Sequence, residues 1–194
     1  AICVLLNWRL APPELDFIMS DATPKVMVHD RDCAALIEAM EERALHGIAT
    51  TGLGEASPYE DALAAAEPSH LEPCGDLMLD DPWALIYTSG TTGRPKGGPQ
   101  TFRMAFINCV NASAAIGMTA ASRSLTFLPL FHTAGLNTYL LPMLHNGAHT
   151  TVMRSFDPGE VLRVIGDPAA GITHFLGVPA NYLFMSQHPD FEAT

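Results

Sequence analysis

Short apolar runs alternate with amphipathic segments along most of this chain. Apolar runs of four to six residues bounded by Gly, Pro or Asn are typical of strands, whereas apolar residues spaced three and four apart indicate helices. The pattern predicts strands at residues 2–6, 25–28, 47–51, 83–87, 125–129, 148–153 and 172–176. It predicts helices at residues 12–20, 33–43, 59–67, 102–117, 138–144, 158–165 and 180–186. Strands that alternate with helices predict an α/β fold of layered, parallel-rich sheets with flanking helices.

Several of the predicted helices begin at residues suited to helix N-termini. Glu14 lies in the first turn of the first helix, where a negative charge is favourable. Asp30 or Asp32 can cap the second helix, in which Ala34, Ile37 and Met40 have helical spacing. Asp157 can cap the helix that follows it.

Composition and length limit the class of protein. The chain has 194 residues, 48% hydrophobic and 16% charged, which predicts one or two small globular domains. No apolar stretch approaches the roughly 20 residues of a membrane span, and no basic segment precedes an apolar one as in a signal peptide. The four cysteines, at positions 3, 33, 74 and 109, lack zinc-site spacing and predict reduced, mostly buried thiols in a cytoplasmic protein. A pair of disulfides is the alternative.

The net charge of −11 is distributed unevenly. Residues 1–80 carry 15 acidic and 4 basic residues, whereas residues 81–194 carry 6 of each. Positions 82–156 contain five basic residues and no Asp or Glu, so this is the region where a polyanionic ligand meets least repulsion. The acidic balance of the whole chain argues against nucleic-acid binding.

The most informative stretch is WALIYTSGTTGRPKG, at residues 83–97. Its apolar run ends in six small residues, four of which carry hydroxyls: Thr88, Ser89, Gly90, Thr91, Thr92 and Gly93. Lys96, one of only two lysines in the chain, follows shortly. Backbone N–H groups, hydroxyls and one ammonium group together suit a phosphate-binding loop, although the spacing is not that of a Walker A motif. A surface loop that is merely rich in Thr and Gly is the alternative.

Residues 87–97, YTSGTTGRPKG, resemble the phosphate-loop signature of adenylate-forming enzymes. These include acyl- and aryl-CoA synthetases, peptide-synthetase adenylation domains and firefly-type luciferases. The resemblance implies an enzyme that activates a carboxylic acid with ATP, forms an acyl-adenylate and pyrophosphate, and passes the acyl group to a thiol. It implies ATP, Mg²⁺ and CoA as cofactors or co-substrates. It also implies that residues 88–93 and Lys96 bind the phosphates, with Lys96 as a catalytic residue.

A second motif, PLFHTAG, follows the predicted strand at 125–129. A His at the end of a strand lies where open α/β sheets hold ligands, yet a lone His beside a Phe is more often structural. The motif resembles the second core motif of the same family, which implies that His132 is a catalytic residue beside the carboxylate and acyl pocket. Phe131 is then a neighbouring wall of the substrate site. Asn181 and Phe184, on the last predicted helix, are weaker candidates for the same pocket.

The chain departs from the family pattern after Lys96. The family continues there with a Thr/Ser-His pair, but Phe102 follows Thr101, and Pro99 removes a backbone donor from any strand. The later segments that supply the Glu for the metal, the Asp for the ribose and the late catalytic Lys are absent, so no metal ligand is assigned. The resemblance therefore predicts a partial N-terminal, ATP- and acyl-binding domain, with a first α/β part at about residues 1–80, a second at 81–194, and no C-terminal domain.

Two classes of function follow from these patterns. The first is a portion of an acyl-CoA synthetase whose partners are ATP, CoA and a small-molecule carboxylic acid, expected to be a fatty acid, with the isolated chain inactive. The motif at Phe131 and His132, with the segment around Trp8, resembles acyl-CoA synthetases more than peptide-synthetase adenylation domains. An aryl-CoA ligase and a peptide-synthetase adenylation domain stay as alternatives. The second class is a truncated, catalytically silent binding or structural module. The sequence predicts no membrane span and leaves a homo-oligomer open.

Overall fold

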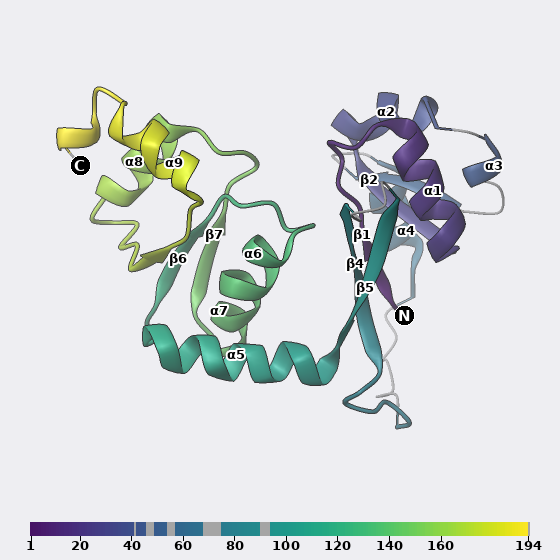
Figure 1. Ribbon diagram of the computed structural model, residues 1–194, viewed down its shortest axis with the longest axis horizontal. Coiled ribbons are helices and arrows are strands. Elements are labelled where there is room, and N and C mark those ends of the chain that lie inside the picture. Colours follow the sequence, from purple (N-terminus) through teal and green to yellow (C-terminus); the bar gives the residue numbers. More distant parts are fainter. Residues whose placement is uncertain (41, 46–48, 54–56, 68–74, 90–93, 194) are drawn as a thin grey trace. The chain divides into compact units, whose positions relative to one another are not determined.

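The computed structural model describes residues 1–40, 42–45, 49–53, 57–67, 75–89 and 94–193. The chain forms two compact units, Ala1–Pro99 and Gln100–Thr194, and each combines parallel strands with helices (Figure 1). The predicted fold class, α/β with parallel-rich sheets and flanking helices, is confirmed. The strand that precedes the phosphate-loop segment pairs with the first strand of the chain and belongs to the first unit.

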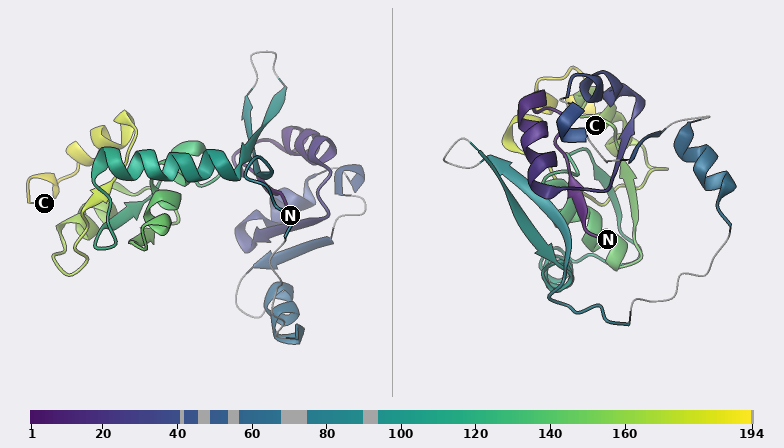
Figure 2. Two further views of the ribbon diagram at one scale, coloured as in Figure 1. Left: turned by 90° about the horizontal axis from the view of Figure 1, so that it is seen from below. Right: turned by 90° about the vertical axis from the view of Figure 1, so that its right-hand side faces the viewer.

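The first unit contains the sheet that carries the phosphate-loop segment. Its strands are β1 (Cys3–Leu5), β4 (Pro82–Ser89) and β5 (Pro95–Thr101), in the order β1-β4-β5. Strands β1 and β4 are parallel, with Cys3 opposite Ala84. Strands β4 and β5 are neighbours joined by a short connection, and because a parallel connection needs about a dozen residues they form a hairpin (Figure 2). Strand β5 is at the sheet edge, where a proline is tolerated. Pro99 therefore does not prevent the segment after Lys96 from forming a strand.

A second sheet of the first unit pairs β2 (Val26–Asp30) with β3 (Ala49–Leu53) in parallel. The helices of the first unit are α1 (Pro12–Ala22), the 3₁₀-helix η1 (Arg31–Cys33), α2 (Ala34–Glu38), α3 (Glu42–Leu45) and α4 (Pro58–Ala65). The Glu14 carboxylate accepts a hydrogen bond from the Ala11 N–H at 3.1 Å, as a residue in a first helical turn can. The core of this unit gathers five buried side chains: Leu15, Met19, Met27, Met40 and Ala44.

The single helix predicted to run to residue 43 is wrong. Asp30 does act as a cap, because its carboxylate accepts from the Cys33 N–H at 3.1 Å, but it caps the short η1. Helix α2 then ends at Glu38, and the Met40 N–H bonds to the Ile37 carbonyl in a tighter, three-residue turn. Ile37 and Met40 still face the core, as their spacing predicted, but the series of backbone hydrogen bonds between residues four apart is interrupted.

The second unit is built on a three-stranded parallel sheet in the order β7-β6-β8. The strands are β7 (His149–Val152), β6 (Arg123–Thr126) and β8 (His174–Phe175). Its helices are α5 (Phe102–Ile116), α8 (Pro158–Gly166), α9 (Pro179–Ser186) and the terminal 3₁₀-helix η3 (Phe191–Ala193). Asp157 caps α8 as predicted, since its carboxylate accepts from the Glu160 N–H at 2.8 Å.

The two faces of strand β6 carry different side chains. Leu125, and Phe127 just after the strand, pack into a buried cluster with Val161 and Leu162 of α8 and with Met185 of α9. Successive strand residues point to opposite faces, so Ser124 and Thr126 lie on the other face. Both are buried, and the hydroxyls of Ser124 and Thr150 bond to each other across β6 and β7.

A long helical segment follows β6 and begins earlier than the predicted residue 138. It consists of α6 (Thr133–Gly135), the π-helix η2 (Leu136–Leu140) and α7 (Leu141–His145). Pro142 has no N–H to donate to the preceding turn, and such a break in the bonding ladder is a usual cause of irregular helical turns.

The sequence predicts that the chain has no membrane span and that its cysteines are mostly buried. Among the described residues, no helix is both long and apolar enough to cross a bilayer. Of the three described cysteines, only Cys109 is buried, whereas Cys33 is half-buried and Cys3 is exposed, so the expectation of mostly buried thiols is wrong.

Candidate functional site

The phosphate-loop segment leaves the sheet from strand β4. Thr88 and Ser89, predicted as loop residues, are the last residues of that strand, and Thr88 is exposed. Gly90, Thr91, Thr92 and Gly93 lie outside the described residues. Lys96 is the second residue of β5 and is exposed. The structure thus brings Thr88, Ser89 and Lys96 to the same end of one hairpin.

The hairpin contacts helix α1 on both sides of this segment. The Tyr87 hydroxyl donates a hydrogen bond to the Asp21 carboxylate at 2.6 Å. The Arg94 guanidinium carbon lies 6.0 Å from the centre of the Phe17 ring, which is a cation–π distance. Partial burial, followed by the hydrogen bond to Asp21 and the charge of that carboxylate, raises the pKa of Tyr87 well above its ordinary value.

His132 lies beyond the carboxyl end of β6, the central strand of the second unit. It is the N-cap of α6, and its Nδ1 accepts from the Ala134 N–H at 3.4 Å. In a neutral ring this assigns the proton to Nε2, which is left as a hydrogen-bond donor. His132 is exposed and Phe131 is half-buried. An exposed donor at the carboxyl end of a parallel strand can reach an anionic substrate group.

Gly135 sets the position of this short helix, and sequence reasoning missed it. A Cβ at this position would lie 2.5 Å from the Pro129 carbonyl oxygen and 2.6 Å from that of Leu128. Only glycine allows the helix to approach the chain leaving β6 so closely. The signal was present in the sequence, because Gly135 ends the PLFHTAG motif, but the motif alone does not reveal what the glycine touches.

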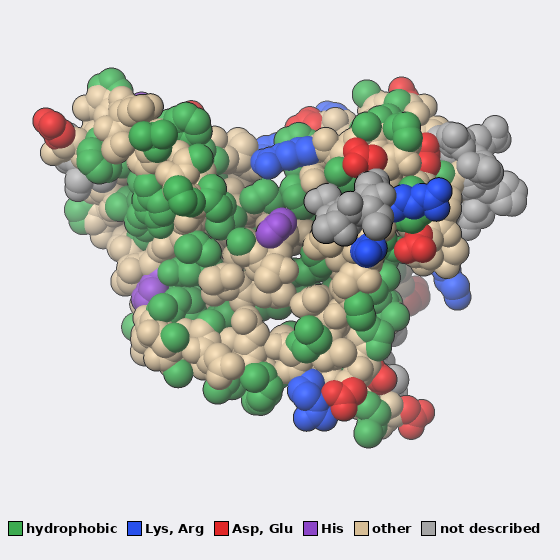
Figure 3. Space-filling model, viewed as in Figure 1, with side chains coloured by type: hydrophobic (Ala, Val, Ile, Leu, Met, Phe, Trp, Pro, Cys, Tyr) green, Lys and Arg blue, Asp and Glu red, His purple; other side chains and the backbone are tan. Residues whose placement is uncertain are grey.

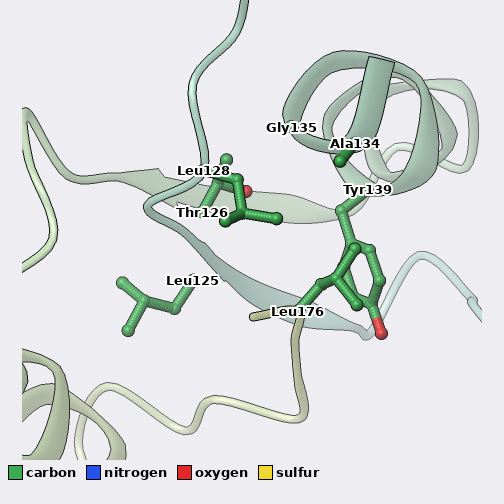
Figure 4. A pocket seen from close by; sticks show the side chains of 7 residues that line it. All are labelled: Leu125, Thr126, Leu128, Ala134, Gly135, Tyr139 and Leu176. Carbon is green, nitrogen blue, oxygen red and sulfur yellow. The ribbon is translucent and has the colours of Figure 1, made fainter. Parts of the chain in front are cut away.

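A small hollow opens beside this helix (Figure 4). It is shallow, open to solvent and roomy enough for about one water molecule. Seven residues from β6, α6, the π-helix and the segments after β6 and β8 line it: Leu125, Thr126, Leu128, Ala134, Gly135, Tyr139 and Leu176. The lining is mostly apolar. The buried Thr126 hydroxyl has no hydrogen-bond partner among the described residues. Burial, and to a lesser extent the nearby Tyr182, raises the pKa of Tyr139.

The weaker candidates on α9 have other surroundings. The Asn181 side chain is buried and accepts from the Val178 N–H at 2.8 Å, so it helps to start the helix. Phe184 is 53% exposed. Neither residue lines the hollow. Their assignment to an acyl pocket stays a prediction.

The described residues do not gather the side chains that a metal ion needs. No group of three or more His, Cys, Asp or Glu side chains with metal-binding geometry occurs within them. The chain from residue 82 to 156 has no carboxylate at all. We therefore assign no residue of this chain to Mg²⁺.

Comparison with known proteins identifies the class. Residues 1–194 match the AMP-binding enzyme family. The chain is 36% identical over 189 residues to the feruloyl-CoA synthase of Amycolatopsis sp, and 97% of this chain aligns with 36% of that protein. It is 34% identical over 192 residues to the long-chain-fatty-acid–CoA ligase FadD13 of Mycobacterium tuberculosis, and 98% of this chain aligns with 37% of that protein.

Solved structures agree with this class. The ATP-bound MatB of Rhodopseudomonas palustris superposes with a TM-score of 0.80 at 30% identity, over 95% of this chain and 35% of that one. The chain belongs to the AMP-binding enzyme family, and its relatives are adenylate-forming CoA ligases. The resemblance predicted from residues 87–97 is confirmed. The chain spans little more than a third of the length of the curated relatives that it matches.

Proposed function

We propose that this chain is the ATP- and acyl-binding portion of an acyl-CoA ligase. The full-length protein activates a carboxylic acid with ATP, releases pyrophosphate, and transfers the acyl group from the adenylate to CoA. The observation that carries the proposal is the hairpin of β4 and β5. It brings Thr88, Ser89 and Lys96 of the family signature to one end of the hairpin, in a part of the chain that has no carboxylates.

The chemistry needs charge stabilisation more than a base. The carboxylate is already a nucleophile, and its attack on the α-phosphate displaces pyrophosphate, so the enzyme must hold the phosphates and neutralise the leaving group. Thr88, Ser89 and the residues at 90–93 would supply hydroxyl and backbone donors. Lys96 would supply a positive charge to the departing phosphates. Mg²⁺, when bound, would screen the same phosphate charge.

The second unit would supply the acid site. The Nε2–H of His132 is exposed and can donate to the carboxylate of the acid. Phe131 would form a wall beside it. The mostly apolar lining of the adjacent hollow favours an apolar acid, and we propose a fatty acid, in keeping with the similarity to a long-chain-fatty-acid–CoA ligase. An aromatic acid is the alternative, because the chain is also similar to a feruloyl-CoA synthase.

We propose that residues 1–194 are part of the N-terminal, ATP- and acyl-binding domain of a longer protein, with the C-terminal domain outside this chain. The share of each relative that aligns supports this. Apolar side chains are also exposed on α5 and α9, as on an element that is covered in a larger protein (Figure 3). They include Met104, Phe106, Ile107, Leu183 and Phe184. A cytoplasmic location and a homo-oligomer belong to the same proposal.

The test is thioester formation by the full-length protein from ATP, CoA and a panel of carboxylic acids. Lys96→Ala should raise the KM for ATP by about tenfold, the effect of losing one charge-assisted hydrogen bond, and leave the KM for the acid unchanged. Lys25→Ala, at the other lysine of the chain, is also exposed and is the matched control.

His132→Ala should do the reverse and change the KM for the acid, with His149→Ala as its exposed control. Unchanged ATP kinetics in Lys96→Ala would remove that residue from its role, and an unchanged acid profile would remove His132. A full-length protein that forms no thioester with any acid would favour the silent binding module instead. The 194 residues alone are expected to form none.

A further inference from the structure

One face of helix α1 contacts the hairpin before and after the phosphate-loop segment. Tyr87, the residue before Thr88, bonds through its hydroxyl to Asp21 at 2.6 Å, although the two lie 66 positions apart. Arg94, the first described residue after the segment, lies over the ring of Phe17 at 6.0 Å. Phe17 and Asp21 are four residues apart on a helix, so they share one face.

Helix α1 is well anchored on its other side. Leu15, Ile18 and Met19 are almost completely buried, with at most 2% of each side chain exposed. The Leu15 and Met19 side chains belong to the core of the first unit. Because its buried face is fixed in the core, helix α1 is a rigid support for residues that contact its other face. Here these are Tyr87 in β4 and Arg94 just before β5.

Gly97 leaves room for the Tyr87 ring. A Cβ at position 97 would lie 3.0 Å from Cζ of Tyr87 and 3.2 Å from its hydroxyl oxygen. A side chain there would push the phenol away from Asp21. The phenol is protonated at neutral pH and donates to the carboxylate, and partial burial and this bond raise its pKa further.

We infer that Tyr87 and Asp21 are positioning residues for ATP. Their hydrogen bond, supported by Arg94 on Phe17, holds the end of β4 and the start of β5 on helix α1, and Gly97 leaves space for the phenol. This inference rests on the proposed function, because the proposed function gives Thr88, Ser89 and Lys96 a phosphate to bind. Neither Tyr87 nor Asp21 is required to touch the substrate. Each acts by fixing the position of the backbone that carries the donors of Thr88 and Ser89 and the charged side chain of Lys96.

The experiment compares four variants of the full-length protein: Tyr87→Phe, Asp21→Ala, Asp21→Asn and Gly97→Ala. The matched control is Tyr59→Phe, which removes the same hydroxyl from helix α4. Three quantities are measured: the KM for ATP, the KM for the acid, and the hydrogen exchange of the Thr88 and Ser89 amides without ligand.

Tyr87→Phe and Asp21→Ala should raise the KM for ATP by about three- to tenfold, the range for one partly exposed hydrogen bond to a charge, and leave the KM for the acid unchanged. The two amides should exchange faster in both variants. Asp21→Asn should stay near wild type, because its amide oxygen still accepts from the phenol. Gly97→Ala should reproduce the ATP defect with both bonding partners intact.

The outcomes separate this inference from the proposed function. If the wild-type protein uses ATP and Tyr87→Phe matches it in KM and in exchange, the positioning role is wrong and the function stands. If Tyr87→Phe changes both KM values equally and Asp21→Asn does not restore them, the bond is a general stability contact and the inference is also wrong. If the wild-type protein does not bind ATP, both fail together.

Discussion

Gly135 offers the sharpest test of the acid site. Replacing it with alanine places a Cβ 2.5 Å from the Pro129 oxygen, whereas ordinary contact begins at 3.4 Å. The clashing atoms are backbone, so no side chain can turn away, and α6 must retreat by about 0.9 Å to restore that contact. His132 is the N-cap of the same short helix and would move with it.

Two effects should follow from this shift. Forcing an extra methyl group into a packed site costs about 1–3 kcal/mol of unfolding free energy, which lowers the Tm by about 2–12 °C at this chain length. A displacement near 1 Å of a substrate-positioning group can reduce the rate by up to about 100-fold. We therefore expect kcat/KM for the acid to fall by about 10- to 100-fold while the KM for ATP is unchanged.

The assay is thioester formation by the full-length protein over a range of acid concentrations, together with thermal unfolding. Gly75→Ala is the matched control, because a Cβ at that exposed position meets nothing within 4 Å. If Gly135→Ala keeps both the wild-type Tm and the wild-type acid kinetics, the close approach does not constrain α6. If it loses stability while acid kinetics are unchanged, the approach is real but His132 does not depend on it.

Three further predictions concern single side chains. Thr126→Val removes a buried hydroxyl without a described partner, so denaturant unfolding should show a change within about 1 kcal/mol or a gain in stability, and a loss above about 2 kcal/mol would mean that the hydroxyl is bonded. Asp157→Ala should cost about 1 kcal/mol by removing the cap of α8, with Asp157→Asn close to wild type; equal losses in both would contradict a capping role. The pKa of Tyr87 is raised in the folded state, so the phenol of the unfolded chain ionises first. The free energy of unfolding of the wild type should therefore fall as the pH rises above the ordinary pKa of 10.0. Tyr87→Phe should reduce this pH dependence, and equal slopes in the two proteins would refute the assignment.

The strands were predictable because burial leaves a local signal. The apolar runs at residues 125–129 and 148–153 correspond to β6 and β7, which pair in parallel. The helix predicted up to residue 43 shows the limit of this reasoning. Ile37 and Met40 do pack in or against the core, so the spacing reported the buried side correctly. Spacing does not report whether each N–H finds its partner four residues back, and here the ladder breaks.

Some residues of the candidate site were also predictable from the sequence, and others were not. The phosphate-loop segment and His132 could be proposed from sequence because their chemistry is contained in short motifs. Asp21 could not, because it acquires a role only through Tyr87, 66 positions away. Gly135 belongs to a motif, but its role depends on two carbonyl oxygens that the fold brings against it. Residues whose function is to support others are visible only once the chain is folded.

The central sheet of the second unit has a consequence for how such a protein can evolve. On one face of β6, Leu125 is fixed in a dense cluster with α8 and α9, where any change of volume is costly. Leu125 also reaches the hollow, together with Thr126, but Ala134 and Tyr139 line the hollow without belonging to that cluster. If the hollow is part of the acid site as proposed, substitutions at Ala134 or Tyr139 would alter the shape offered to an acid while the packed cluster stays intact. A lineage could then change its acid at little cost to its fold.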